Sequence, residues 1–250
     1  MVAERGRGVS GLSVAHLSYA YRQKVALDDL SFEAGPGFTA LLGPNGAGKS
    51  TLFALLTRLF VSRQGSITVA GHDLARAPRR ALAEIGVVFQ QPTLDLDMSV
   101  ARNMSYFAAL HGLSGQASEA RITDALVRLG MAERAGERVR DLNGGHRRRM
   151  EIARALVHDP SVLLLDEPTV GLDAASRRAI TDHVHDLADD GLCVLWATHL
   201  VDEIRPADHV VVLHQGRKRA DGLAAEIAGD VTLTESFLQL TAVSQPVGVA

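Results

Sequence analysis

The sequence lacks the residues of several specialised protein classes. A single cysteine, Cys193, excludes an intramolecular disulfide, and its place in the apolar run from Leu192 to Trp196 favours a small core residue over a nucleophile. The formal net charge is -3, whereas proteins that bind nucleic acid usually have a surplus of basic residues that neutralises the phosphates. We therefore expect a reduced, cytoplasmic protein with no nucleic acid among its partners.

Long apolar runs are also missing. No stretch approaches the ~20 apolar residues that span a bilayer, and residues 1–11, MVAERGRGVSG, lack the apolar core of a signal peptide. Apolar residues still make up 46% of the 250 residues, which is enough for a substantial core. The sequence predicts a protein that is soluble by itself and reaches a membrane only through a partner.

Hydrophobic patterning is typical of an α/β protein. Predicted strands alternate with predicted helices, and a largely helical stretch at 100–158 interrupts the alternation. This order favours a parallel sheet with ligands at its carboxyl edge. Strands are expected at 12–17, 30–32, 38–42, 66–69, 85–89, 161–165, 193–197 and 210–213, and further helices at 49–60, 175–187 and 200–204.

The most specific motif follows the third predicted strand. Residues 43–50, GPNGAGKS, match the pattern G-x-x-x-x-G-K-[ST] between a strand and a helix. Its glycines turn backbone N–H groups towards phosphate, Lys49 supplies a positive charge, and the Ser50 hydroxyl can ligate Mg²⁺. The alternative is a chance glycine-rich turn, which the flanking strand and helix disfavour. The residues predicted to bind a nucleoside triphosphate are Gly43, Asn45, Gly46, Gly48, Lys49, Ser50 and Thr51.

Two acidic residues end the apolar run at 162–165. Adjacent strand residues point to opposite sides, so we expect Asp166 to hold Mg²⁺ and Glu167 to activate the attacking water. The alternative is a strand-end acid that caps the next helix. His199 ends the neighbouring predicted strand, where it could donate to a γ-phosphate, although a lone histidine after a strand is more often structural.

These segments together resemble the ABC ATPase family over about residues 12–230. GPNGAGKST resembles the family's Walker A motif, LLLDEP its Walker B motif, and VGLD its D-loop. The resemblance implies ATP and Mg²⁺ as ligands and catalytic roles for Glu167, His199 and Gln90, with Gln90 also near the metal. It further implies a nucleotide contact for Asp173.

The resemblance also implies an aromatic ring stacked on adenine. Tyr21 lies where the family places this ring, and Tyr19, two residues earlier, competes for the role. An ordinary surface tyrosine is the alternative.

The segment LNGGH, followed by RRRMEIAR, separates ABC ATPases from other nucleotide-binding families. It resembles the family signature, usually LSGGQ, at the start of a helix: Asn143 is a good N-cap, and Gly144 and Gly145 let backbone approach an anion. Asn143 replaces the usual serine, and we predict that its amide keeps the phosphate contact. His146 replaces the glutamine, and because histidine titrates near ~6.5 we predict a mild pH dependence of turnover. A plain capped helix is the alternative.

The resemblance implies a mechanism that needs partners. Two copies would sandwich two ATP molecules, with the signature of one copy closing on the γ-phosphate held by the other. Gln90 would link that phosphate to the helical insertion and to a surface at 91–98 that contacts an integral membrane permease. The chain would then be peripheral on the inner face of the cell membrane.

The end of the chain narrows the type of transporter. LTESFLQLT at 233–241 resembles the terminal helix of type-2 exporter ATPases, with a plain packing helix as the alternative, and GGHRRRMEIARAL is similar to exporter relatives. NGGH with VFQQPTLDLDMSV resembles ATPases associated with pyrroloquinoline quinone-dependent alcohol catabolism in bacteria. A soluble non-transport ABC ATPase and a regulatory subunit with weak hydrolysis stay as alternatives.

The predicted architecture is therefore an α/β P-loop NTPase core with a mostly parallel sheet. An antiparallel β subdomain precedes it, and an α-helical subdomain is inserted in it. We predict the ATPase domain at 11–230, the helical insertion at about 96–158, and a C-terminal helix with a loose tail at 231–250.

Overall fold

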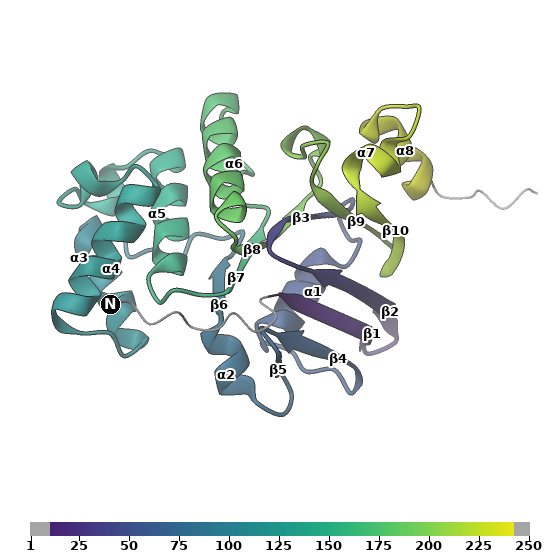
Figure 1. Cartoon of the computed structure of the whole chain (residues 1–250), viewed down its shortest axis with the longest axis horizontal. Helices are drawn as coiled ribbons and strands as arrows, with labels where there is room; N and C mark the ends of the chain where they lie inside the picture. Colours follow the sequence, from purple (N-terminus) through teal and green to yellow (C-terminus); the bar gives the residue numbers. More distant parts are fainter. Residues whose placement is uncertain (1–10, 243–250) are drawn as a thin grey trace, which may run out of the picture.

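A six-stranded sheet forms the centre of the molecule (Figure 1). The computed structural model describes residues 11–242. The strand order is β10-β9-β3-β8-β7-β6, in which β10 is antiparallel to β9 and the other neighbours are parallel. The strands are β3 (Gly37–Leu42), β6 (Ile85–Val88), β7 (Val162–Asp166), β8 (Cys193–Thr198), β9 (His209–His214) and β10 (Arg217–Leu223).

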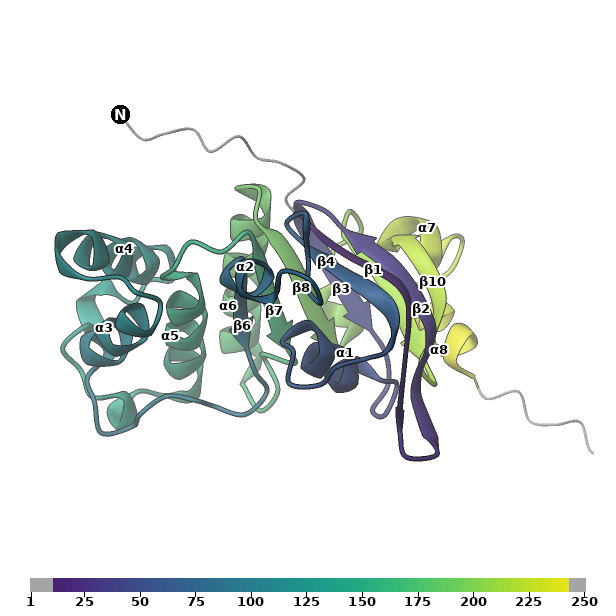
Figure 2. The ribbon, with the colours of Figure 1, turned by 90° about the horizontal axis from the view of Figure 1, so that it is seen from below.

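A second, antiparallel sheet has the order β2-β1-β4-β5. Figure 2 shows it beside β10, at the end of the molecule away from α3, α4 and α5. Its strands are β1 (Leu12–Tyr21), β2 (Lys24–Ala34), β4 (Gln64–Val69) and β5 (His72–Asp73).

Three helices stand together at the opposite end (Figures 1 and 2). They are α3 (Val100–Leu110), α4 (Gly115–Arg128) and α5 (Gly144–Leu156), and the 3-10 turns η1 (Ala132–Arg134) and η2 (Val139–Asp141) connect α4 to α5. Side-chain caps define two of the starts, because Ser99 accepts from Arg102 N–H and Asn143 accepts from His146 N–H. We call α3, α4 and α5 the helical group.

The remaining helices flank the sheets. α1 (Lys49–Leu56) follows β3, α2 (Pro78–Ala83) precedes β6, and α6 (Ala174–Asp189) connects β7 to β8. The 3-10 turn η3 (Val201–Glu203) follows β8, and α7 (Ala224–Ala228) and α8 (Leu233–Thr241) follow β10. Thr232 and Glu235 form a capping box at the start of α8.

The core lies on both faces of the central sheet. On β7, Leu163 and Leu165 join the cluster that includes α3 to α6, whereas Val162 and Leu164 join the cluster that includes α1 and the antiparallel sheet. All four side chains are 0% exposed, as alternation along a strand covered on both faces requires.

The predicted fold class is confirmed: the protein has a P-loop NTPase core with a mostly parallel sheet, an antiparallel N-terminal sheet and an inserted helical group. Several boundaries were wrong. α1 ends at Leu56 and not at residue 60, because Arg58 turns to a φ of 58°. β2 is far longer than 30–32, since pairing with β1 extends it through polar residues. β5, α2 and α7 were not predicted.

The terminal helix at 233–241 is confirmed as α8. The loose tail predicted at the end of the part at 231–250 lies outside the described residues. Within residues 11–242, no helix has both the length and the apolar character needed to cross a bilayer.

Candidate functional site

Four predicted segments meet at one edge of the central sheet. The strands β3, β8, β7 and β6 are consecutive neighbours and parallel, so their carboxyl ends share that edge. The loop at 43–48 follows β3, His199 follows β8, Glu167 follows β7 and Gln90 follows β6. The topology thus brings together groups that are up to 156 residues apart, from position 43 to position 199.

Close backbone contacts explain why two positions of the phosphate loop are glycine. Gly48 has a φ of 116°, and a Cβ there would lie 2.8 Å from the carbonyl oxygen of Ala26. A Cβ on Gly43 would lie 2.5 Å from the carbonyl oxygen of Leu213. The N–H of Gly43 donates to Thr198 O at 3.2 Å, which fastens the loop to the end of β8. The loop is therefore fixed against both neighbouring strands.

Lys49 is buried in this loop, with 4% of its surface exposed. Its Nζ donates to the carbonyl oxygens of Gly43 at 2.6 Å and Pro44 at 3.3 Å, and lies 3.1 Å from Glu167 Oε1. A buried ammonium group needs such partners because it has left water. The lysine is thus held where an incoming anion would compete with Glu167.

Asp166 ends β7 with 6% exposure. Burial, followed by the neighbouring Glu167, raises the pKa of its carboxyl, and the Ser50 hydroxyl and Lys49 oppose this shift. Asp166 Oδ1 is buried without a hydrogen-bond partner among residues 11–242. An unpartnered carboxylate oxygen next to a hydroxyl fits a hard divalent cation such as Mg²⁺.

Glu167 adopts an unusual backbone conformation, with a φ of 48°. Such a non-glycine residue costs about 1–3 kcal/mol, and strain of this kind clusters at functional sites. Its N–H donates to Ala197 O at 2.9 Å, and its Oε1 lies 3.4 Å from His199 Nδ1, outside hydrogen-bond alignment. The carboxylate is thus placed between Lys49 and His199, where the predicted catalytic groups converge.

A buried glutamate that the sequence analysis missed holds these loops. Glu203 is 3% exposed and accepts from Trp196 Nε1 at 3.0 Å, from Thr198 Oγ1 at 2.6 Å and from Thr169 Oγ1. It therefore joins the end of β8 to the segment after Glu167. Only the position of Glu203, four residues after His199, was available as a signal.

Gln90 lies in the segment after β6 and is exposed. Its carbonyl oxygen accepts from Arg148 Nη2 at 3.0 Å, so α5 holds its backbone. Arg148 was not among the predicted site residues.

The signature segment starts α5. Asn143 Oδ1 accepts from His146 N–H at 2.8 Å, which confirms the predicted N-cap, and both Asn143 and Gly144 are exposed. Since Oδ1 serves as the cap, the amide Nδ2 is the atom left to donate to a ligand. Burial, followed by Arg134 and Arg149, lowers the pKa of His146, so charging moves below the pH range that its residue type predicts.

Asp173 begins α6 beside this segment. Its carboxylate accepts from Ser176 N–H and Ser176 Oγ, both at 2.9 Å, and these bonds lower its pKa. A Cβ added to Gly145 would lie 2.7 Å from Ser176 Oγ. The glycine therefore lets the start of α5 pack closely against the start of α6.

Tyr21 and Tyr19 differ in their surroundings. Tyr21 is 43% exposed, and its hydroxyl lies 3.3 Å from Thr51 Oγ1 at the phosphate loop. Tyr19 is half-buried and stacks on Phe60 with ring centroids 5.6 Å apart and planes at 4°. One face of Tyr19 is therefore already covered by an aromatic ring.

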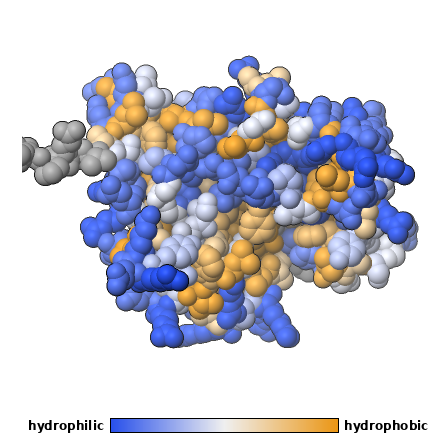
Figure 3. Space-filling model, turned by 180° about the vertical axis from the view of Figure 1, so that it is seen from behind, coloured by the Kyte–Doolittle hydropathy of each residue, from blue (hydrophilic) through white to orange (hydrophobic). Residues whose placement is uncertain are grey.

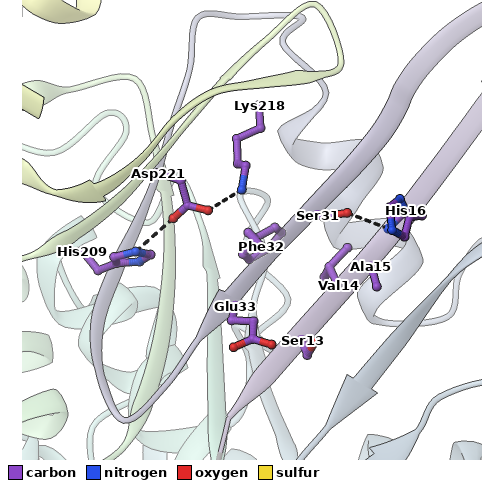
Figure 4. A pocket seen from close by; sticks show the side chains of 10 residues that line it. All are labelled: Ser13, Val14, Ala15, His16, Ser31, Phe32, Glu33, His209, Lys218 and Asp221. Carbon is purple, nitrogen blue, oxygen red and sulfur yellow. Dashed lines mark hydrogen bonds and ion pairs between the residues drawn. The ribbon is translucent and has the colours of Figure 1, made fainter.

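A separate hollow lies between the antiparallel sheet and the β9–β10 hairpin (Figure 4). Three of its side chains pair with one another: Asp221 Oδ1 lies 3.0 Å from His209 Nε2, and Asp221 also pairs with Lys218. Glu33, His16 and Ser31 line its other side. It contains none of the predicted site residues, so we place the chemistry at the sheet edge.

The fold and this edge define a nucleotide-binding ATPase of the P-loop class. The family described as ABC transporter matches residues 27–170, which is more than half of the chain. This chain belongs to that family, binds ATP and hydrolyses it.

Similar proteins include two named ATP-binding proteins and a solved structure. The Nod factor export ATP-binding protein I of Paraburkholderia xenovorans is 38% identical over 85% of this chain and 72% of its own length. The daunorubicin resistance ATP-binding protein DrrA3 of Streptomyces coeruleorubidus is 37% identical over 84% of this chain and 67% of its own. The structure of cbiO1 from Clostridium perfringens, part of the ABC transporter complex cbiONQ, has a TM-score of 0.80, with 31% identity over 88% of this chain and 90% of that chain.

Proposed function

We propose that the chain is the ATP-hydrolysing subunit of an exporter and works as a dimer that sandwiches two ATP molecules. Relatives named for Nod factor export and daunorubicin resistance support the exporter direction. The predicted association with quinone-dependent alcohol catabolism stays a prediction. We retain the proposed boundaries of the ATPase domain at 11–230, with its helical insertion at about 96–158, and of the C-terminal part at 231–250.

The observation that carries the dimer is a divided site. The phosphate loop at the start of α1 and the signature at the start of α5 lie on either side of β6, β7 and β8 in Figures 1 and 2. Asn143 and Gly144 are exposed, and helix starts with exposed N–H groups attract phosphate. A second copy would supply the signature that each phosphate loop lacks beside it, and Asp173 would line the same junction.

The hydrolytic step follows from the contacts of Lys49. Triphosphate oxygens would replace Glu167 as partners of Lys49, and the carboxylate of Glu167 would then accept a proton from the attacking water. The backbone N–H groups of Asn45, Gly46 and Gly48 would hold the phosphates, and His199 would donate to the γ-phosphate. Mg²⁺, held by Ser50 and Asp166 with Gln90 nearby, would neutralise charge on the phosphates.

The adenine position is assigned to Tyr21. Its exposed ring lies next to Thr51, a further donor to the nucleotide phosphates, whereas Tyr19 is already stacked on Phe60. Aromatic stacking recognises any base, so this contact would contribute affinity more than selectivity.

An integral membrane permease is the proposed second partner, contacting residues 91–98. Most of this segment is exposed, including Leu96 at 44%, yet its backbone is held by Asn103, which bonds Asp95 N–H and Asp95 O. Exposed, fixed surface suits a docking site. Apolar residues also gather in patches on the face of the molecule in Figure 3. This docking would place the chain on the cytoplasmic face of the membrane.

The test uses a variant that binds ATP without consuming it. Glu167→Gln should form dimers with ATP and Mg²⁺, measured by size-exclusion chromatography with light scattering, and should return to monomers with ADP. A chain that stays monomeric at saturating ATP, in isolation and with its co-expressed membrane protein, would refute the sandwich dimer.

A further inference from the structure

A buried ion pair lies within α5, one turn after the signature. Arg148 and Glu151 are 6% and 3% exposed, and Arg148 Nη1 donates to Glu151 Oε2 at 2.8 Å. Burial lowers the pKa of Arg148 and raises that of Glu151, and the charge of each partner opposes the shift of the other. Because desolvation offsets the attraction, such a pair contributes little net stability.

Both members of the pair have second contacts outside the helix. Arg148 donates to Phe89 O at 2.8 Å and to Gln90 O at 3.0 Å, and Glu151 Oε1 accepts from Thr93 N–H at 2.8 Å. One turn further, Arg154 Nη1 donates to Thr93 O at 2.9 Å. Side chains of α5 therefore hold the backbone of 89–93, which follows β6 and includes the first residues of the proposed docking segment at 91–98.

We propose that Arg148 and Glu151 are positioning residues that make segment 89–93 and α5 move as one body. This inference rests on the proposed function. Arg148 bonds the carbonyl of Gln90 and not its side chain, so the amide of Gln90 is left for the γ-phosphate of its own site. The other end of the same body is Asn143, which serves the site of the second copy.

The consequence is a direct link between the two ATP sites. Any displacement of Gln90 on phosphate binding is passed through the guanidinium of Arg148 to the helix that presents Asn143 and Gly144. The bonds are charge-assisted and at least partly buried, which makes them stronger than surface pairs. A filled phosphate loop would thereby set the position of the signature for the partner's nucleotide.

The test replaces the whole pair, because removing one charge would strand the other. Arg148→Met combined with Glu151→Leu fills the same space without charge and should fold with a thermal midpoint close to that of the original chain. Binding of ADP to the monomer should stay within about twofold, because the phosphate loop is untouched. ATP turnover, and ATP-driven dimerisation in the Glu167→Gln background, should fall by about tenfold or more, on the scale of couplings between contacting groups.

Two comparisons separate positioning from mere structure. Arg217→Met removes an ion pair with Asp28, which joins β10 to β2, and should leave turnover unchanged. In a Gln90→Ala background, the paired replacement should cost less than about twofold, since positioning acts through Gln90. A structural role would give the same loss in both backgrounds.

The outcomes also separate this inference from the proposed function. Suppose that Glu167→Gln with native α5 dimerises with ATP. If the paired replacement dimerises at the same ATP concentration in that background, and has full turnover when Glu167 is intact, the positioning role is wrong and the dimer stands. If Glu167→Gln with native α5 never dimerises, the proposed function fails first.

Discussion

The phosphate loop and the signature have similar backbones, in which glycines adjoin the start of a helix, but they differ in their charges. Gly48 is the N-cap of α1. Asn143 is the N-cap of α5, and Gly144 and Gly145 follow it. The phosphate loop has no side-chain cap, and Lys49 and Glu167 face each other beside it. The signature is capped by Asn143, and the two exposed residues at its start, Asn143 and Gly144, carry no charge.

This difference in charge implies different roles for the phosphate loop and the signature. In the proposed mechanism, the charges that would polarise phosphate and activate water sit at the phosphate loop, where burial strengthens them. Neutral donors at the start of α5 can orient a phosphate but cannot deprotonate water. Under the proposed function, one region would therefore serve the chemistry and the other would complete the site of a second copy.

The largest expected effect tests the chemical side. Glu167→Gln keeps the shape of the side chain but cannot accept a proton, so turnover should fall about 10²–10⁴-fold, the usual contribution of a general base. Steady-state ATPase assays measure this, and ADP binding should be unchanged. Turnover within tenfold of the original would mean that another group activates water.

The next effect tests the signature. Asn143→Ala removes both the cap and the amide donor, and turnover should fall about 10–100-fold, because a hydrogen bond to a charged group is worth roughly 1.5–3 kcal/mol. Asn143→Ser keeps a cap and a donor and should recover most of the activity.

The cap alone must be separated from the phosphate contact. Thr232→Ala removes a comparable cap from α8, with an expected stability loss of about 1 kcal/mol, and should leave turnover intact. If Asn143→Ala lost stability but kept full turnover, the signature would serve its helix only.

The chemical side was predictable because its signals are local. GPNGAGKS and LLLDEP each lie within a few residues, and the parallel sheet then brings their loops together. Asn143 was recognised as a cap for the same reason, since its acceptor role needs only His146 N–H three residues later.

The residues that connect the regions were missed because their partners are distant in the chain. Arg148 bonds Phe89 from 59 residues away, and Glu203 bonds Thr169 from 34 residues away. Neither residue belongs to a local motif that would have marked it. The short helices α2 and α7 have 6 and 5 residues, too few to show a helical period.

A third prediction tests the junction between the helical group and the sheet. His158 follows α5, stacks on His111 at 4.0 Å and lies 3.0 Å from Ile85 O through Nε2. Its Nδ1 is buried without a partner among residues 11–242. Burial, then the charge of His111, lowers its pKa to about 4, against opposing effects of Ile85 O, Asp159 and Glu84.

The sign of the pH effect follows. The pKa of His158 is near its ordinary value of 6.5 in the unfolded chain and about 4 in the folded chain, so the full stability is present above pH 6.5 and is lost as pH falls from 6.5 to 4. Urea unfolding should show a loss of about 1–2 kcal/mol from pH 7 to pH 5. His158→Gln should remove this loss, and His16→Gln, which changes a side chain 80% exposed, should retain it. An equal slope in all three chains would contradict the assignment.

The smallest expected effect tests how Tyr21, beside the phosphate loop, contributes to binding the adenine base. Tyr21→Ala should weaken ADP binding about fivefold, because an aromatic stack is worth roughly 0.5–1.5 kcal/mol, and Tyr21→Phe should bind as the original does. Calorimetry with ADP and GDP should give the same loss for both nucleotides, since stacking does not read base edges. Tyr19→Ala should lower the thermal midpoint by uncovering Phe60, yet leave affinity unchanged. If Tyr19→Ala weakened binding more than Tyr21→Ala, the adenine would belong to Tyr19, and the phosphate-loop region would extend across the aromatic cluster to Phe60.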